Sequence, residues 1–301
     1  MPSLLAPDRQ LGVIGAGVMG RTLLRGLFDA NLITPDQAWA SAHTQESCDE
    51  VTADLGIPCL RDPAVALAAG QLASATSYSE RLAETDVVLI CVKPKQAPQV
   101  VDALLRANVR RDTLLVSILA GVTTTRLEQL LDLSNPWVRA MPNTPCVVGE
   151  GMTVVAGGTH ASDAHLELAQ RIFASVGRCR IVDESYCNAV TALSGSGPAY
   201  MYLMMEAMAD AGVRVGLPRD LALQLVAQTM LGSARMVLET NRHPASLRDD
   251  VTTPAGCTIG GVLMLEDGKI RSVLARAVEE ATRIVEQLGK TARTAQDKAT
   301  T

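Results

Sequence analysis

The chain has 301 residues, of which 48% are hydrophobic and 20% charged, a composition typical of a globular protein long enough for two domains. Its net charge of −5 and its scattered basic residues argue against nucleic acid or an anionic membrane as a partner. The seven cysteines form no C-x-x-C pair, so we expect small, buried, reduced cysteines in a cytoplasmic protein and no metal site.

No basic region followed by an apolar segment opens the chain, so no secretory signal is visible. Residues 185–205 carry no charge, but polar residues and a proline interrupt them. We therefore expect a helix buried in protein there and not a membrane span.

The first predicted unit is a strand, a glycine-rich turn and a helix. Residues 11–15 are typical of a buried parallel strand, and residues 18–30 of the helix that follows. Gly15, Gly17 and Gly20 fit G-x-G-x-x-G, in which backbone N–H groups approach a pyrophosphate at the positive end of the helix dipole. Tight packing of a strand against a helix is the alternative. The motif predicts a dinucleotide contacted by Gly15, Ala16, Gly17, Val18, Met19 and Gly20.

Apolar runs then alternate with helical patterns as far as residue 183, which predicts a parallel α/β sheet of the Rossmann type. Further strands are expected at residues 38–42, 57–60, 87–92, 114–118, 137–141, 152–156 and 179–182. Helices are expected at residues 45–55, 97–106, 124–131 and 163–175, with Thr123 and Ser162 as N-caps. Residues 62–76 are expected to form an additional helix or loop.

From residue 184 onward the pattern changes to helices alone. They are expected at residues 185–192, 199–213, 219–240, 244–251, 259–266 and 270–288. We therefore expect a dinucleotide-binding domain over residues 1–183 and an all-helical domain over residues 184–301.

The carboxyl ends of the strands supply the other cofactor candidates. After the second strand, an NAD-preferring fold places Asp or Glu on the ribose 2′-hydroxyl. Ser41, His43 and Thr44 stand there instead, and their hydrogen-bond donors favour NADPH, with NADH possible. An ordinary exposed loop residue explains His43 equally well.

The nicotinamide side is expected to involve Cys91, Val92, Lys93, Pro94, Ala120 and Asn143. The alternative interpretation of Lys93 is a solvated lysine at a strand end, and that of Asn143 is a residue of a rigid turn.

In the helical domain, the loop 252–258 opens directly onto the helix expected from residue 259. Free N–H groups in the first turn of a helix, flanked by threonine hydroxyls, suit a small carboxylate. A threonine N-cap with a Pro-Gly turn would explain the same residues without a ligand.

Residues 247–266 resemble the signature of the pyrroline-5-carboxylate reductase family, a Ser/Thr-Ser-Pro-Gly-Gly-x-Thr-Ile loop that runs into a helix. The resemblance covers nearly the whole chain, with motifs in family order at residues 15–20, 92–94, 120–123, 141–145, 191–200 and 216–219. The chain departs from the pattern at Thr253, where serine is usual, and at Ala255, where the first loop glycine is usual. The segment of residues 62–76 is longer than the corresponding segment typical of the family.

The resemblance implies NAD(P)H-dependent reduction of L-1-pyrroline-5-carboxylate to L-proline, the last step of proline biosynthesis. It implies a homodimer with interlocking helical domains, in which one chain's nucleotide domain meets the partner subunit's substrate loop. Rings of dimers, such as decamers, occur in the family. The substrate-binding residues implied are Glu184, Thr253, Gly256, Cys257 and Thr258.

Thr258 is the expected catalytic residue, because its hydroxyl would hydrogen-bond the ring nitrogen and relay a proton to it. Glu184 matches an acidic family position and would stabilise the iminium charge or line the pocket. A structural carboxylate at the domain boundary is an equally good account of Glu184.

Three other functions are weighed against this one. A β-hydroxyacid dehydrogenase would use a lysine on the first helices of the helical domain, and no lysine lies between Lys95 and Lys269. A reductase of a related cyclic imine would use the same residues. A nucleotide-sensing regulatory protein with a silent site is the non-enzyme alternative, which the intact loop hydroxyls disfavour.

Overall fold

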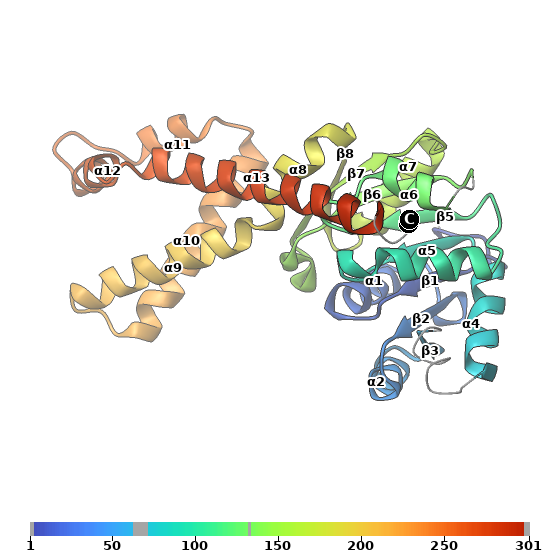
Figure 1. The fold of residues 1–301 in the computed structure, drawn as a ribbon. Coiled ribbons are helices and arrows are strands. Elements are labelled where there is room, and N and C mark those ends of the chain that lie inside the picture. The colour runs from blue at the N-terminus through green and yellow to red at the C-terminus, as the bar shows by residue number, and fades with distance from the viewer. Residues whose placement is uncertain (1–2, 63–71, 132–133, 298–301) are drawn as a thin grey trace. The chain divides into compact units, whose positions relative to one another are not determined.

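The computed structural model describes residues 3–62, 72–131 and 134–297 (Figure 1). The chain divides into two compact units, Met1–Gly195 with Thr282–Thr301 (unit 1) and Ser196–Ala281 (unit 2). The domain boundary expected at residues 183 and 184 stays a prediction. The compact units divide twelve residues later, between Gly195 and Ser196, because residues 184–195 pack on the sheet of unit 1.

Unit 1 is built on an eight-stranded sheet with the order β3-β2-β1-β4-β5-β6-β7-β8. The strands are β1 (Leu11–Ile14), β2 (Ala38–Ala42), β3 (Cys59–Arg61), β4 (Val87–Ile90), β5 (Leu114–Ser117), β6 (Trp137–Met141), β7 (Gly151–Gly157) and β8 (Gly177–Ile181). The Rossmann-type fold is thus confirmed. The expectation of a wholly parallel sheet is wrong at one pair, because β7 runs antiparallel to β6. The short turn η3 (Thr144–Val148), which begins between two prolines, reverses the chain there.

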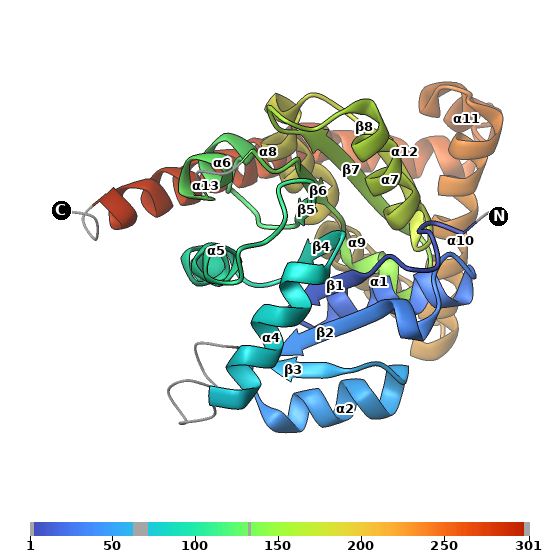
Figure 2. The same ribbon diagram turned by 90° about the vertical axis from the view of Figure 1, so that its right-hand side faces the viewer.

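Helices cover both faces of the sheet, as strands that alternate between two buried faces require (Figure 2). Val13 belongs to one core and Ile14 to the other. The first face is covered by α1 (Val18–Asp29), α2 (Gln45–Leu55) and α7 (Asp163–Ala174), and the second by α4 (Leu72–Glu84), α5 (Ala97–Arg106) and α6 (Thr124–Leu131). Short 3₁₀ turns η1 (Pro35–Gln37) and η2 (Pro94–Gln96) precede β2 and α5.

Two predicted helix starts are confirmed. Thr123 caps α6, since its Oγ1 accepts a hydrogen bond from the backbone N–H of Arg126 at 3.2 Å. Ser162 is the N-cap residue of α7, where the His165 side chain accepts from its backbone N–H at 3.1 Å. The element expected over residues 62–76 falls largely on residues 63–71, which lie outside the described residues; helix α4 begins at Leu72.

Residues 184–195, here called the connector, lead out of β8 in three short pieces. They are the 3₁₀ turn η4 (Glu184–Tyr186), the single turn α8 (Cys187–Val190) and the π-helical turn η5 (Thr191–Gly195). The sequence predicts one regular helix here instead. The hydroxyl of Thr191 donates a hydrogen bond to the carbonyl oxygen of Cys187 at 2.7 Å. This bond lies where the α-helical hydrogen-bond pattern changes to that of the wider π turn.

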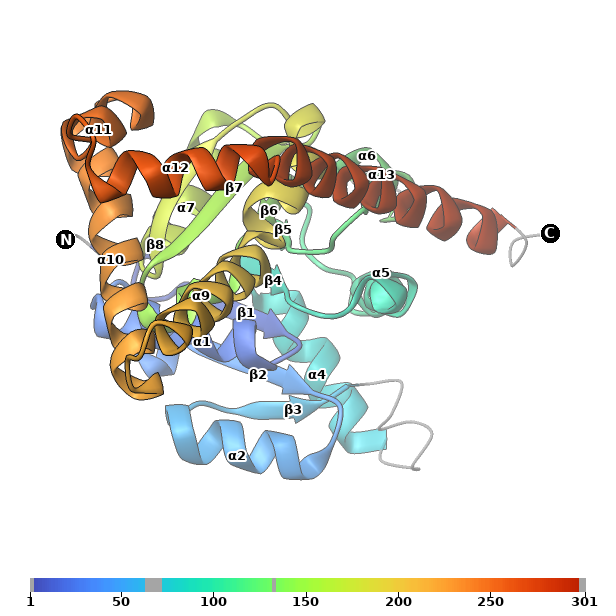
Figure 3. The ribbon, with the colours of Figure 1, turned by 90° about the vertical axis from the view of Figure 1, so that its left-hand side faces the viewer.

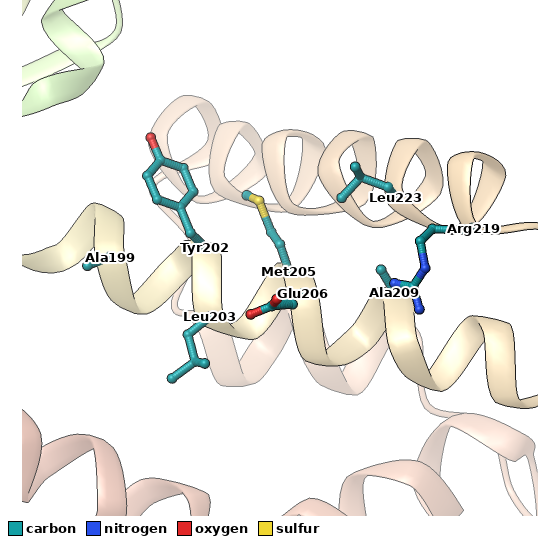
Figure 4. Close-up of a pocket in the computed structure, with 8 residues that line it drawn as sticks. All are labelled: Ala199, Tyr202, Leu203, Met205, Glu206, Ala209, Arg219 and Leu223. Atoms are coloured by element: carbon teal, nitrogen blue, oxygen red, sulfur yellow. The ribbon is translucent and has the colours of Figure 1, made fainter.

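Unit 2 is helical, as predicted (Figure 3). Its helices are α9 (Gly197–Arg214), α10 (Arg219–Thr240), α11 (Pro244–Asp250), α12 (Cys257–Asp267) and the first part of α13 (Ile270–Asp297). Helices α9 and α10 pack side by side, and a Cβ at Gly212 would lie 3.0 Å from the Cβ of Ala222. Between them an open groove of about 640 Å³ is lined by Ala199, Tyr202, Leu203, Met205, Glu206, Ala209, Arg219 and Leu223 (Figure 4).

The cysteines are all free thiols, and the expectation that they are buried holds fully for three of them and in part for three more. Cys48, Cys146 and Cys187 are buried, and Cys59, Cys91 and Cys179 are half-buried. Cys257 is the exception, because it is exposed at the start of α12.

Candidate active site

The glycine turn after β1, in unit 1, is the candidate site for a dinucleotide. Gly15 has a φ of +95°, and a Cβ there would lie 2.8 Å from the carbonyl oxygen of Cys91. A Cβ at Gly20 would lie 2.6 Å from the carbonyl oxygen of Gly15. Both positions therefore need glycine for the close packing of β1, α1 and the end of β4.

The presence of glycine at position 17 has a different explanation. It is the N-cap of α1 with a φ of −77°, and a Cβ there would meet no atom within 4 Å. Neither packing nor backbone conformation within the protein accounts for glycine at this position. The open space lies at the first turn of α1, where the N–H groups of Val18 and Met19 have no intrahelical acceptor. This is the geometry that a pyrophosphate requires.

Two of the expected N–H donors are already used within the protein. Gly15 and Ala16 donate their backbone N–H groups to the carbonyl of Ser41, at 3.1 and 2.8 Å. A contact of these two residues with the cofactor stays a prediction, although their N–H groups are engaged within the protein. They fix the shape of the turn, and the donors left for an anion are those of the α1 first turn.

The end of β2 also differs from the expectation. Ser41 is 2% exposed and hydrogen-bonds to the buried Tyr78, whose pKa is raised by its own burial. Thr44 caps α2, with its hydroxyl oxygen accepting from the backbone N–H of Ser47 at 3.2 Å. A contact of Ser41 with a 2′-phosphate stays a prediction, and Thr44 is engaged in capping. His43 is exposed at this edge and remains a candidate.

The residues after β4 and β5 lie at the carboxyl ends of their strands, as predicted. Cys91 donates its backbone N–H to the carbonyl of Ile14 at 2.8 Å, beside the glycine turn. Burial raises the pKa of its thiol to about 12, so Cys91 stays protonated and contributes shape but no nucleophile. Val92 is half-buried, and Lys93 and Pro94 are exposed. Ala120 is half-buried against Cys187 and its neighbours.

The contacts of Asn143 are those expected of a residue in a rigid turn. Its Oδ1 accepts from the backbone N–H of Met152 at 2.8 Å, and its Nδ2 donates to the carbonyl of Ser194 at 3.2 Å. The amide thus joins the end of β6 to β7 and to the connector. A contact of Asn143 with the cofactor stays a prediction.

Glu184 is held by groups of unit 1 on both carboxylate oxygens. Its Oε1 accepts from the backbone N–H of Thr124 at 2.8 Å, and its Oε2 accepts from the Thr124 hydroxyl at 2.7 Å. The guanidinium of Arg139 lies 3.5 Å from Oε1 and donates to Asn188 at 3.2 Å. The geometry favours the structural interpretation of Glu184. Sequence reasoning missed Arg139, for which the only signal was a charge inside the apolar strand β6.

The loop before α12 is a separate candidate site, for a small carboxylate, and it lies in unit 2. Helix α12 begins at Cys257, two residues earlier than predicted, so Thr258 stands in the first helical turn. Gly256 is the N-cap, and no side chain caps this turn. The N–H of Gly256 donates to the carbonyl of Thr253 at 3.0 Å, and a contact of Gly256 with the substrate stays a prediction. The N–H groups of Cys257 and Thr258 remain without an intrahelical acceptor.

Thr253 is exposed beside this turn, and Thr258 is half-buried. A Cβ at Gly256 would lie 2.3 Å from the Oγ1 of Thr253, so only glycine lets that hydroxyl approach the N-cap. Two hydroxyls and a free helix N-terminus are thus available to a small anion. Among the described residues, no group of three or more His, Cys, Asp or Glu side chains could hold a metal ion.

Ala255 adopts a left-handed backbone conformation with a φ of +56°. For a residue with a Cβ, that conformation costs about 1–2 kcal/mol. We expect Ala255→Gly to raise the free energy of unfolding by about 0.5–1 kcal/mol, since glycine's added chain entropy offsets part of the relief. Chemical denaturation measures the change. Ala53→Gly, at an exposed position inside α2, is the control and should lose about 1 kcal/mol. A loss of unfolding free energy in Ala255→Gly equal to that in Ala53→Gly would contradict backbone strain at Ala255.

Comparisons with known proteins match both halves of the chain. A family model described as pyrroline-5-carboxylate reductase dimerisation matches residues 184–288, and one described as NADP oxidoreductase coenzyme F420-dependent matches residues 10–121. The pyrroline-5-carboxylate reductase of Schizosaccharomyces pombe is 38% identical over 288 residues, which cover 92% of this chain and 98% of that protein. The chain belongs to the pyrroline-5-carboxylate reductase family.

Solved structures of pyrroline-5-carboxylate reductases agree with the fold. The Coxiella burnetii enzyme is 31% identical with a TM-score of 0.83, over 93% of this chain and 98% of that one. The Plasmodium falciparum enzyme, solved with NADP bound, is 29% identical with a TM-score of 0.79, over 95% of this chain and 100% of that one. The reductase family model begins at Glu184, the residue at which the sequence pattern changes to helices alone.

Proposed function

We propose that this chain reduces L-1-pyrroline-5-carboxylate to L-proline with a reduced nicotinamide dinucleotide, in the last step of proline biosynthesis. The observation that carries the proposal is the 38% identity to a named reductase over 92% of the chain, which includes both the glycine turn and the loop before α12. The turn provides for a dinucleotide and the loop provides for a small carboxylate. These are the two reactants that the reaction needs.

The residues of the glycine turn fit the dinucleotide. The open space at Gly17 and the first-turn N–H groups of α1 accommodate its pyrophosphate. When bound, the reduced nicotinamide supplies the hydride. We propose NADPH as the preferred form. This is supported by the absence of Asp and Glu from residues 41–44 and by the NADP named for the Plasmodium falciparum relative.

The chain's own groups bind and orient the imine. The N–H groups of Cys257 and Thr258, together with the hydroxyl of Thr253, hold the substrate carboxylate. The hydroxyl of Thr258 hydrogen-bonds the ring nitrogen and relays to it a proton taken up from water, so the threonine ends the step protonated. A protonated imine is the stronger electrophile, so the protein contributes orientation and a path for one proton.

The working form is proposed to be a homodimer, in which the partner subunit's substrate loop completes the site. Helix α12 has no buried residue, and Leu263, Met264 and Leu265 are all more than half exposed. By length and composition, one helix among the described residues, α10 (Arg219–Thr240), could cross a membrane. Its apolar surface and the groove beside it are better explained by a second copy in a cytoplasmic protein. Light scattering on the purified protein should give twice the chain mass or an even multiple, and a monomer would contradict the dimer.

The substrate is tested by comparing ring sizes and cofactors. Purified protein is expected to oxidise NADPH with pyrroline-5-carboxylate, more slowly with NADH, and more slowly still with the six-membered cyclic imine. A preference for the larger ring would make the chain a reductase of a related imine. No turnover with either cofactor would overturn the proposal.

A further inference from the structure

The connector is bound to other segments of unit 1 at two separate polar points. At its start, Glu184 binds Thr124 through both carboxylate oxygens at 2.8 and 2.7 Å, with Arg139 at 3.5 Å. Near its end, the carbonyl of Ser194 accepts from Asn143 at 3.2 Å. Ser194 belongs to the π-helical turn η5, and Glu184 lies at the other end of the connector. The connector is therefore held near both of its ends by residues of other segments.

The first of these points also holds the loop after β5. Thr124, which Glu184 binds, is the first residue of α6 and follows the loop that contains Ala120. Ala120 itself packs against a small apolar cluster of Met141, Val154, Ala156 and Cys187. Cys187 belongs to the connector and Met141 ends β6. The Ala120 loop and the connector are thus packed on each other by both polar and apolar contacts within unit 1.

Stability alone does not account for Arg139. It is 1% exposed, and its Nε makes no hydrogen bond, although Glu184 and Asn188 engage the two other nitrogens. Replacing a buried ion pair with uncharged residues of similar volume is often neutral or stabilising, because burying two charges is expensive. An incompletely satisfied buried arginine therefore points to a geometric role.

We infer that Arg139 and Glu184 are positioning residues for hydride transfer. They fix the Ala120 loop at the expected nicotinamide end of the cofactor, and they do so through Thr124 and the connector. The inference rests on the proposed function. Neither side chain touches the reacting atoms on this account, so their loss should misalign hydride donor and acceptor without removing a chemical group.

The test combines Glu184→Gln with the double variant Arg139→Met/Glu184→Gln. The single variant leaves a buried arginine without its counter-ion, so its melting temperature should fall. Its kcat should fall about tenfold or more, since a misplacement of about 1 Å costs about 100-fold. The double variant removes both charges and should recover most of the melting temperature. Its kcat should stay low, because the Ala120 loop is still not held.

A primary deuterium isotope effect separates positioning from folding. With NADPH deuterated at the transferred hydride, the effect on kcat should be larger than wild type in both variants, because hydride transfer becomes more rate-limiting. A purely structural role would reduce the fraction of active enzyme and leave the isotope effect unchanged. Recovery of kcat together with the melting temperature, or a wild-type isotope effect in both variants, would overturn the inference.

Glu128→Gln is the matched control. Glu128 lies on α6, the helix that begins at Thr124, and binds Thr159 as Glu184 binds Thr124, accepting from its backbone N–H at 2.6 Å and its hydroxyl at 2.9 Å. It should keep the wild-type kcat and isotope effect, and a loss equal to that of Glu184→Gln would count against the inference. If wild-type protein does not reduce pyrroline-5-carboxylate, both the proposed function and this inference fail. If wild type turns over and both test variants match it, the inference alone fails.

Discussion

Gly17→Asp should weaken NADPH binding about 100-fold or more while leaving the protein at least as stable as the wild type. Gly17 is the N-cap of α1 with an ordinary φ of −77°, and a Cβ there meets nothing within 4 Å. Aspartate is a favoured N-cap residue, and its charge suits the helix dipole, so the helix gains about 0.3–1 kcal/mol. The same carboxylate occupies the N–H groups that the pyrophosphate needs and repels its charge. The loss of two charge-assisted hydrogen bonds, each worth about 1.5–3 kcal/mol, should raise the KM for NADPH about 100-fold or more.

The opposite directions of the two effects make this variant informative. Melting temperature and NADPH titration are measured on the same preparation, with Gly17→Asn as a control that caps the helix without a charge. The asparagine variant should bind NADPH more tightly than the aspartate variant. Unchanged NADPH affinity in Gly17→Asp would place the dinucleotide somewhere other than the α1 turn. Loss of stability would show that Gly17 serves packing.

Thr258→Val should lower kcat/KM for pyrroline-5-carboxylate about 10- to 150-fold, the value of one hydrogen bond to a charged group of about 1.5–3 kcal/mol. Valine keeps the shape of threonine and removes only the hydroxyl. Thr258 stands in the first turn of α12, where the structure shows no side-chain cap, so the fold should not depend on that hydroxyl. Steady-state kinetics with varied imine and saturating NADPH measures the loss.

Thr258→Ser is the matched control, because it keeps the hydroxyl and loses one methyl group. It should stay within severalfold of wild type. Equal losses in the serine and valine variants would assign Thr258 a packing role. Wild-type kinetics in the valine variant would remove Thr258 from the reaction.

Features that follow from local periodicity were predictable from the sequence. The expected strands, the helix after the glycine turn and the change to helices at residue 184 depend on neighbours within a few residues. The antiparallel β7 was not predictable in this way, because β7 is as apolar as a parallel strand. Its direction is set by the short η3 turn.

The site residues were predictable only in part, because side-chain engagement depends on residues far away in the sequence. Ser41 stands at the expected strand end, but its hydroxyl is hydrogen-bonded to the buried Tyr78. Glu184 is an acidic residue at the expected position, yet its partners Thr124 and Arg139 come from other elements. Ala255 was recognisable as a departure from the family pattern, whereas its left-handed backbone is a property of the folded loop.

The central claim is that this chain carries a hydride from a reduced nicotinamide to a cyclic imine held by its carboxylate. Wild-type protein incubated with pyrroline-5-carboxylate and NADPH deuterated at the transferred position tests it most directly, with the product identified by mass spectrometry and NMR. The account predicts proline that carries one deuterium, at the ring carbon of the former C=N bond. Unlabelled proline, or no proline with either NADPH or NADH, would contradict it.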